Sequence, residues 1–236
     1  LFPSSPAAPS MQLSIHNDRL LIDGHFSTPL TSAAIYHQST LNDLFVPGLS
    51  ATVGLRLDYE KMRLNYESAS APMNFGFAFA MGPMQIEDPD MQAVTSLAGK
   101  LKHDYLQLLP KFSLQYEWGK DNNVYFTVAK GYRSGGYNIQ MFSDLVQSLM
   151  RNDMKQALME SPQFQSMAGM IDQMLPDVEI DVEGTALYRP EYSWSYELGT
   201  HLTLLGGRLT ADVAGFLMNV RDQQVSQFSE NGMGRV

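Results

Sequence analysis

The sequence predicts an all-β protein: an antiparallel meander that forms an incomplete section of a transmembrane β-barrel, with short helices in a long extracellular loop. Three observations support this prediction. Apolar and polar residues alternate along several segments, the links between these segments are short and long in turn, and tyrosine and tryptophan gather at the segment ends.

The alternation has a period of two residues, which indicates strands with one apolar and one polar face. It is clearest in LSATVGLRLDY, Leu49 to Tyr59, and similar patterns occupy residues 108–118, 124–129, 194–204 and, less cleanly, 209–220. We expect one lipid-side surface to carry Val53, Leu55, Leu57, Phe112, Leu114, Val124, Phe126, Leu198 and Leu202. We expect the opposite surface to carry Arg56, Lys111, Gln115, Glu117 and Glu197.

The links between these segments alternate in length. Tight turns are expected around Pro47-Gly48, within 119–123 and at Gly206-Gly207, where glycine and asparagine supply positive φ. Long links are expected from about Ser68 to His103 and from about Ser134 to Pro190. A soluble β-sandwich does not require links of alternating length, whereas outer-membrane barrels combine short periplasmic turns with long extracellular loops.

Aromatic residues gather near the predicted strand ends, where an interfacial girdle needs rings with an apolar body and a polar tip. Ordinary β-propensity explains tyrosine and tryptophan in strands as well. Together with the alternating links, however, the pattern favours the barrel. The residues are Tyr59, Tyr66, Tyr105, Tyr116, Trp118, Tyr125, Tyr132, Tyr137, Tyr192, Trp194 and Tyr196.

Composition excludes several classes of protein. The formal net charge of −9 argues against a nucleic-acid partner, because phosphate binding needs clustered lysine and arginine. The absence of cysteine excludes disulfides, thiolate metal sites and cysteine nucleophiles. No run approaches the roughly 18 apolar residues of a transmembrane helix. The first residues, LFPSSPAAPS, and the loop-like SENGMG near the end lead us to expect a part of a longer protein.

A helical insert is expected in the second long link, over residues 139–176. Apolar residues recur at helical spacing from Phe142 to Leu158 and from Phe164 to Leu175, and Ser161-Pro162 is typical of a helix start. The insert is rich in methionine, which raises the hypotheses of copper binding by thioethers and of an adaptable apolar ligand surface. We favour packing between two short helices, since methionine commonly fills irregular apolar gaps.

No motif for catalysis is present: the sequence lacks a nucleophile elbow, an HExxH pattern and a phosphate loop. We expect no enzyme, no metal and no cofactor. Glu87, Asp88 and Asp90 lack the pattern of a calcium loop and are expected in a solvated acidic loop. The histidines have no metal-ligand spacing; they are His16, His25, His37, His103 and His201.

Four segments together resemble the TonB-dependent outer-membrane receptors, which import iron complexes and vitamins. They are LSATVGLRLDYEK, LPKFSLQYEW, VYFTVAKGYRSGGYN and RPEYSWSYELGTHLTLLGGRLTADVAGFLMNVRDQQV, which occur in family order. The insert GGYNIQMFSDLVQSLM is similar to versions from the Bacteroides side of the family. The resemblance implies that residues 1–236 form a partial barrel domain, about six to eight strands from the middle of a barrel of roughly 22. No plug domain and no coupling box are recognised.

The same resemblance implies energy-coupled import of an iron chelate, such as a siderophore or haem, or of a similar nutrient across the outer membrane of a Gram-negative bacterium. The expected partners are outer-membrane lipid, the nutrient ligand and a TonB-type coupling protein that acts through the plug. Two alternatives stay open: a passive porin-like or structural barrel, and a soluble carbohydrate-binding β-sandwich. Candidate ligand contacts at the lumen or rim are Arg56, Glu117, Arg133, Tyr137, Asn138 and Glu197.

Overall fold

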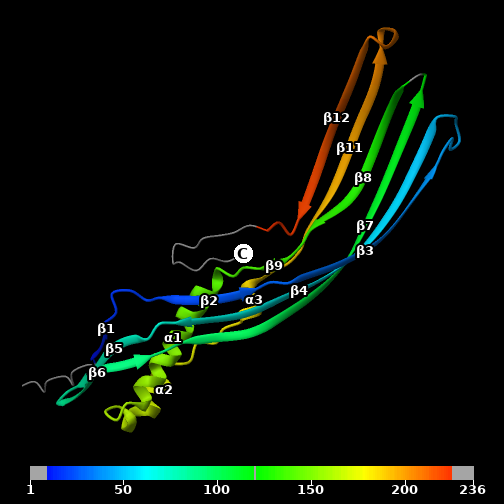
Figure 1. Cartoon of the computed structure of the whole chain (residues 1–236). Coiled ribbons are helices and arrows are strands. Elements are labelled where there is room, and N and C mark those ends of the chain that lie inside the picture. Colours follow the sequence, from blue (N-terminus) through cyan, green and yellow to red (C-terminus); the bar gives the residue numbers. More distant parts are fainter. Residues whose placement is uncertain (1–9, 120, 225–236) are drawn as a thin grey trace, which may run out of the picture.

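A long, curved antiparallel sheet dominates the computed structural model, which describes residues 10–119 and 121–224 (Figure 1). The strand order is β12-β11-β8-β7-β4-β2, and β3 also pairs with β4. The expected all-β meander, an incomplete barrel section with short helices, is therefore confirmed. The strands are β2 (Ile22–Ser27), β3 (Leu30–Leu41), β4 (Leu49–Ser70), β7 (Ser96–Trp118), β8 (Asn122–Arg133), β11 (Glu191–Leu204) and β12 (Leu209–Arg221).

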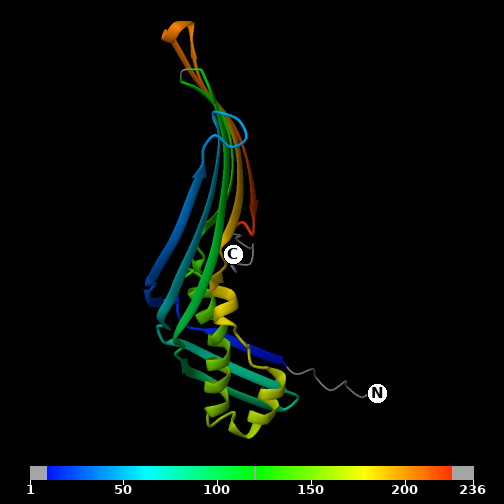
Figure 2. The ribbon, with the colours of Figure 1, turned by 90° about the vertical axis from the view of Figure 1, so that its right-hand side faces the viewer.

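A smaller unit lies at one end of this sheet, where the helices gather (Figure 2). A three-stranded antiparallel sheet with the order β1-β5-β6 packs there against α1 and α2. These elements are β1 (Ser10–Ile15), β5 (Met73–Met81), β6 (Met84–Ala93), α1 (Met141–Glu160), the 3-10 turn η1 (Gln165–Met167) and α2 (Ala168–Met174). The short strands β9 (Gly136–Tyr137) and β10 (Leu187–Tyr188) form a pair beside α3 (Val182–Ala186).

The alternation of short and long links is confirmed, and the strand pairs among the described residues are all antiparallel. The tight turns lie together at the upper end of the sheet in Figure 1, and the long links lie at the other end. The expected extent of the first long link was wrong. Strand β4 continues to Ser70, β7 begins at Ser96, and the β5–β6 hairpin fills the interval. Asp88 and its acidic neighbours therefore lie on strand β6, not in a loop.

The pairing register confirms which predicted residues share a surface. Val53 lies opposite Phe112, Leu114 opposite Phe126, and Phe126 opposite Leu198. Because directly opposite residues point to the same side of a sheet, these side chains form one apolar surface, the outer face. Arg56, Lys111, Gln115, Glu117 and Glu197 lie at the alternate positions and share the opposite, inner face.

The two faces exchange character just past Tyr59, which lies opposite Leu106. Beyond this pair the outer face becomes charged, with Arg63 opposite Lys102. The inner face becomes apolar, with the fully buried Leu64 opposite Leu101. Strands of 22 and 23 residues exceed the roughly 9–11 that cross a bilayer. We infer that the membrane ends near Tyr59 and that the rest of β4 and β7 projects beyond it.

The helical insert covers the projecting part of the inner face. The ring centroid of Phe142 lies 5.0 Å from that of Phe26 and 4.7 Å from that of Tyr66, and both of these residues belong to the main sheet. The proposed helix start at Ser161-Pro162 was wrong. Ser161 instead ends α1 as its C-cap, and its hydroxyl donates a hydrogen bond to Asp88 on β6. Within the described ranges, no helix combines the length and the apolar character needed to cross a membrane.

The outer face carries many exposed apolar side chains, among them Val53, Leu55 and Leu108. Within residues 10–119 and 121–224, no second sheet packs on this face, as a β-sandwich would require. An apolar face of this size fits contact with lipid.

We predict that an arginine on the outer face destabilises the protein in lipid. Leu55 lies midway between the turn before β4 and Tyr59, so Leu55→Arg should cost about 2–4 kcal/mol near the bilayer midplane. Denaturant titration in lipid vesicles measures this cost. Gln38→Arg is the control because Gln38 lies opposite Gly54 on the inner face. Equal losses for both variants would contradict the assignment of the faces.

We also predict that packing of Phe142 on the main sheet stabilises the docking of the helical insert. Phe142→Ala should cost about 3–5 kcal/mol in the docking of α1, because Phe142 is only 1% exposed. Hydrogen exchange should accelerate along α1 and remain slow in β8 and β11. Gln147→Ala on the exposed side of the same helix should change neither. Unchanged exchange in Phe142→Ala would show that the helix is held elsewhere.

Candidate functional site

The inner face carries a row of charged groups next to the point where the two faces exchange character, on the side of the tight turns. Arg56, Asp58 and Glu60 occupy alternate positions of β4 and so point to the same side. The Nε of Arg56 lies 2.6 Å from Oδ1 of Asp58. Both carboxylates are buried: Asp58 is 8% exposed and Glu60 is 5% exposed.

The end of β8 reaches across to these carboxylates. The hydroxyl of Tyr132 donates to Oδ2 of Asp58 at 3.2 Å, and the hydroxyl of Ser134 donates to Oε1 of Glu60 at 2.7 Å. These bonds connect residues 74 positions apart in the sequence. They hold the base of the second long link against the inner wall at the predicted membrane edge.

Three buried polar atoms on this wall have no hydrogen-bond partner among the described residues. They are Oε2 of Glu60 and the hydroxyls of Tyr105 and Tyr137. Glu60 and Tyr105 are direct partners in the β4–β7 ladder. Burial raises the pKa of Tyr137, so its phenol remains protonated and available as a donor. Since an unpaired buried polar group costs about 1–3 kcal/mol, such a group calls for an explanation by water, an ion or a ligand.

A polar hollow of about 340 Å³ adjoins this wall at the long-link end. Arg133, Tyr137 and Asn138 line it, together with Ile139, Gln140, Tyr188 and Gln224. Gln224 closes one side, because its Nε2 donates to the backbone oxygens of Ser134 and Arg189 at 3.0 Å. In the part of the chain that the structure describes, Arg133 forms no ion pair. The described residues of the hollow therefore offer the guanidinium of Arg133, phenols and amides.

The glycines of AKGYRSGGYN shape the wall of this hollow. Strand β9 pairs with β10, and Gly136 lies opposite Tyr188. A Cβ on Gly136 would meet the hydroxyl of the Tyr188 side chain, and a Cβ on Gly135 would lie 2.6 Å from the Tyr188 backbone oxygen. Close approach of the two segments therefore requires glycine at Gly135, whereas at Gly136 the Tyr188 side chain could shift; neither glycine has positive φ.

The six candidate residues divide into separate groups. Only Arg133, Tyr137 and Asn138 meet in the hollow. Arg56 lies on the inner wall and is paired with Asp58. Glu117 and Glu197 lie on the inner face toward the tight turns. There Glu117 accepts a hydrogen bond from Gln115, and Glu197 accepts one from the hydroxyl of Tyr125.

Several residues of the wall and hollow were not predicted as site residues from the sequence. Glu60 could have been found by extending the alternation of β4 one position past Tyr59. Tyr105 required the register of the β4–β7 ladder, which fixes it opposite Glu60. Tyr188 and Gln224 carry no sequence signal that sets them apart, because long-range contacts alone bring them to the hollow.

The methionines of the insert mostly contribute to packing. Met150 is buried among Phe75, Phe164 and other apolar residues, and Met154, Met159 and Met167 pack against the same cluster. Among the described residues, no group of three or more histidine, aspartate and glutamate side chains is arranged to hold a metal ion. His103 lies beside Glu183, with Nδ1 to Oε1 at 3.3 Å, and His201 contacts Asp212.

Comparison with known proteins identifies the family. A family model described as TonB dependent receptor-like, beta-barrel, matches residues 23–235. Among solved structures, the ferric yersiniabactin uptake receptor FyuA from Yersinia pestis is similar, with a TM-score of 0.34 and 16% identity. The similarity covers 94% of this chain and 38% of that receptor. Because the family match extends over nearly the whole chain, this protein belongs to the TonB-dependent receptor-like β-barrel family.

Proposed function

We propose that this chain is part of an outer-membrane transporter that binds an iron chelate or a similar nutrient and imports it by TonB-coupled transport. The observation that carries the proposal is the polar hollow beside three buried polar atoms that have no hydrogen-bond partner in the described part of the chain. Membership of the family supports ligand binding and coupling to TonB in general.

The position of the hollow supports contact with an incoming ligand. Its residues begin level with the point where the outer face turns from apolar to charged, since Arg133 lies between Tyr132 and Ser134, and they continue into the second long link. By the convention of outer-membrane barrels, long links face the outside of the cell. A ligand that approaches the barrel from outside along this link would meet Tyr137 and Asn138 and then Arg133, which lies beside the carboxylates of Asp58 and Glu60.

The chemistry of the hollow favours a polar ligand with negative charge. Arg133 offers a guanidinium that binds carboxylates and phenolates in a bidentate or forked geometry. Tyr137, with its unpaired hydroxyl, and Asn138 and Gln140 offer donors and acceptors around it. Ferric complexes of catecholate and carboxylate chelators present this combination of negative charge and oxygen atoms. We therefore place an anionic ferric chelate first among the ligands.

The apolar outer face supports outer-membrane lipid as the second partner. Val53, Phe112 and Leu198 are exposed on this face, together with other large apolar side chains. In the whole protein, a TonB-type coupling protein would act through a plug domain inside the barrel. The row of Arg56, Asp58 and Glu60 would then face that plug.

Uptake by cells tests the proposed function directly. Cells that express the full-length protein should accumulate radioactive iron supplied as a ferric catecholate, a ferric hydroxamate or haem. Uptake should disappear when the TonB-type protein is deleted, since the transport is energy-coupled. Uptake that persists without the coupling protein would support the passive barrel. Absence of uptake for every iron probe would reject an iron chelate as the ligand.

A substitution at the hollow tests the site. Arg133→Gln should lower uptake at limiting concentrations of an anionic chelate about tenfold, equivalent to the loss of roughly 1.4 kcal/mol of binding free energy. Uptake at saturating concentration should change little. Arg208→Gln is the matched control, because Arg208 is an exposed arginine at the tight-turn end. If the two variants behave alike while both reach the outer membrane, the hollow does not contact the ligand.

A further inference from the structure

A second cavity lies in the projecting unit, between β1 and the helices. Met11, Leu13 and Ile15 of β1 lie opposite Phe79, Phe77 and Phe75 of β5, so all six point toward α1 and α2. The helices bury Phe75 and Phe79 but leave the β1 stripe open, since Leu13 remains 52% exposed. A groove therefore runs between β1 and α1, floored by β5.

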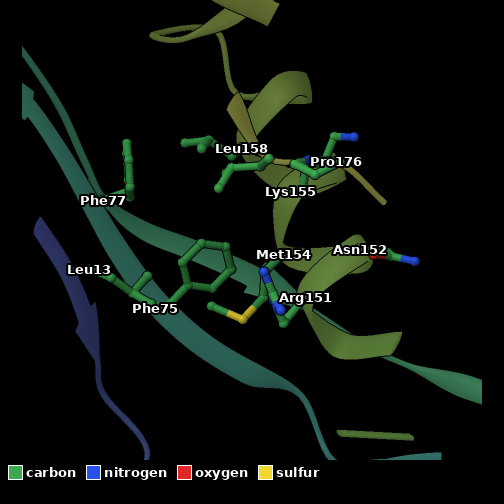
Figure 3. Close-up of a pocket in the computed structure, with 10 residues that line it drawn as sticks. Leu13, Phe75, Phe77, Arg151, Asn152, Met154, Lys155, Leu158 and Pro176 are labelled. Carbon is green, nitrogen blue, oxygen red and sulfur yellow. The ribbon is translucent and has the colours of Figure 1, made fainter. Parts of the chain in front are cut away.

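The groove holds a cavity of about 200 Å³ (Figure 3). Its apolar lining includes Leu13, Phe75, Phe77, Met154 and Leu158. An engineered apolar cavity of about 150 Å³ binds benzene. The space is therefore sufficient for one aromatic ring with a short substituent. The rings of Phe75 and Phe77 and the thioether of Met154 are good contact partners for such a ring.

Among the described residues, one cation without an ion pair borders this cavity. Arg151 lies on α1 beside Met154 (Figure 3) and forms no ion pair with any described residue. The neighbouring Lys155 differs, because its Nζ lies 2.6 Å from Asp172 and 2.7 Å from Asp177. These aspartates raise the pKa of Lys155 and satisfy its charge. Asn152, also at the cavity, is engaged by the backbone of Val178.

We propose that this groove binds a small aromatic carboxylate. The ring would occupy the apolar cavity against Phe75, Phe77 and Leu13, and the carboxylate would pair with the guanidinium of Arg151. A guanidinium is planar and forked, so it matches a carboxylate better than a point charge does. The apolar walls and the guanidinium of Arg151 together select a ligand with one apolar and one anionic end.

The groove is distinct from the hollow on the inner wall. Gln140 borders the hollow and Met154 lines the groove. Along α1 these positions are separated by roughly 20 Å, at about 1.5 Å per helical residue. Binding in the groove requires no transport and does not rest on the proposed function. The ligand could therefore bind a protein that imports nothing.

Titration of the full-length protein in lipid nanodiscs with phenylacetate tests the proposal, with empty nanodiscs subtracted. Saturation-transfer NMR measures the dissociation constant. Phenylacetamide replaces the carboxylate by a neutral group of similar shape, and hexanoate replaces the ring by an aliphatic chain. We expect phenylacetate to bind at least fivefold more tightly than either. Equal binding of the amide would overturn the role of the charge, and equal binding of hexanoate would overturn the choice of an aromatic ring.

Two variants locate the binding. Arg151→Gln should weaken phenylacetate at least fivefold and leave phenylacetamide unchanged. Leu13→Trp should abolish binding of both, because a larger side chain on the open strand β1 fills the cavity. Arg63→Gln, an exposed arginine on the outer face of β4, is the matched control and should bind as the parent does. No detectable binding by the parent, or equal binding by Leu13→Trp, would overturn the proposal.

Discussion

The continuous hydrogen-bonded ladder between β4 and β7 is the constraint on which the rest of the structure depends. It runs without a register shift from Leu49 opposite Tyr116 to Ala69 opposite Ser96. In lipid, backbone N–H and C=O groups must form their hydrogen bonds within the protein, and pairing of neighbouring strands provides these bonds. Because side chains alternate strictly along such a ladder, its register determines the face of each residue in both strands. One slip by a single residue would turn Arg56 toward lipid.

The same ladder explains why the buried carboxylates lie near the inferred edge of the membrane. A strand that crosses the bilayer needs an apolar outer face, while its inner face can be polar. A strand that projects into water and packs against a helix needs a polar outer face and an apolar inner face. The change from one requirement to the other occurs between Tyr59 and Leu64. The buried carboxylates of Asp58 and Glu60 therefore lie where a polar interior meets an apolar core, next to the base of the long link.

The sequence alone was sufficient for features that follow from local pattern. Alternation from Leu49 to Tyr59 predicted both faces, and the turn residues predicted where the strands reverse. It was insufficient where long-range packing overrides local pattern. Residues 73–81 alternate between large apolar and smaller residues, but they were expected within a long link. The helices cover the apolar side of the strand that they form. The pair Ser161-Pro162 is typical of a helix start, but the hydroxyl of Ser161 donates a hydrogen bond to Asp88, which lies on a strand 73 residues away. Arg133, Tyr137 and Asn138 were found as neighbours in sequence, whereas Gln224 joins them only through the fold.

The projecting unit is a small packed body, since α1 is held at three places along its length. Phe142 packs on the main sheet near its start, Asp153 accepts a hydrogen bond from the buried Thr95, and Ser161 bonds to Asp88 at its end. Displacement of α1 alone would break the ring contacts of Phe142 on the main sheet. It would also break the hydrogen bonds to Thr95, in the link between β6 and β7, and to Asp88 on β6. The helix, β5 and β6 must therefore move together if they move at all. The hollow at the start of α1 and the groove farther along it are consequently fixed relative to each other by one rigid element.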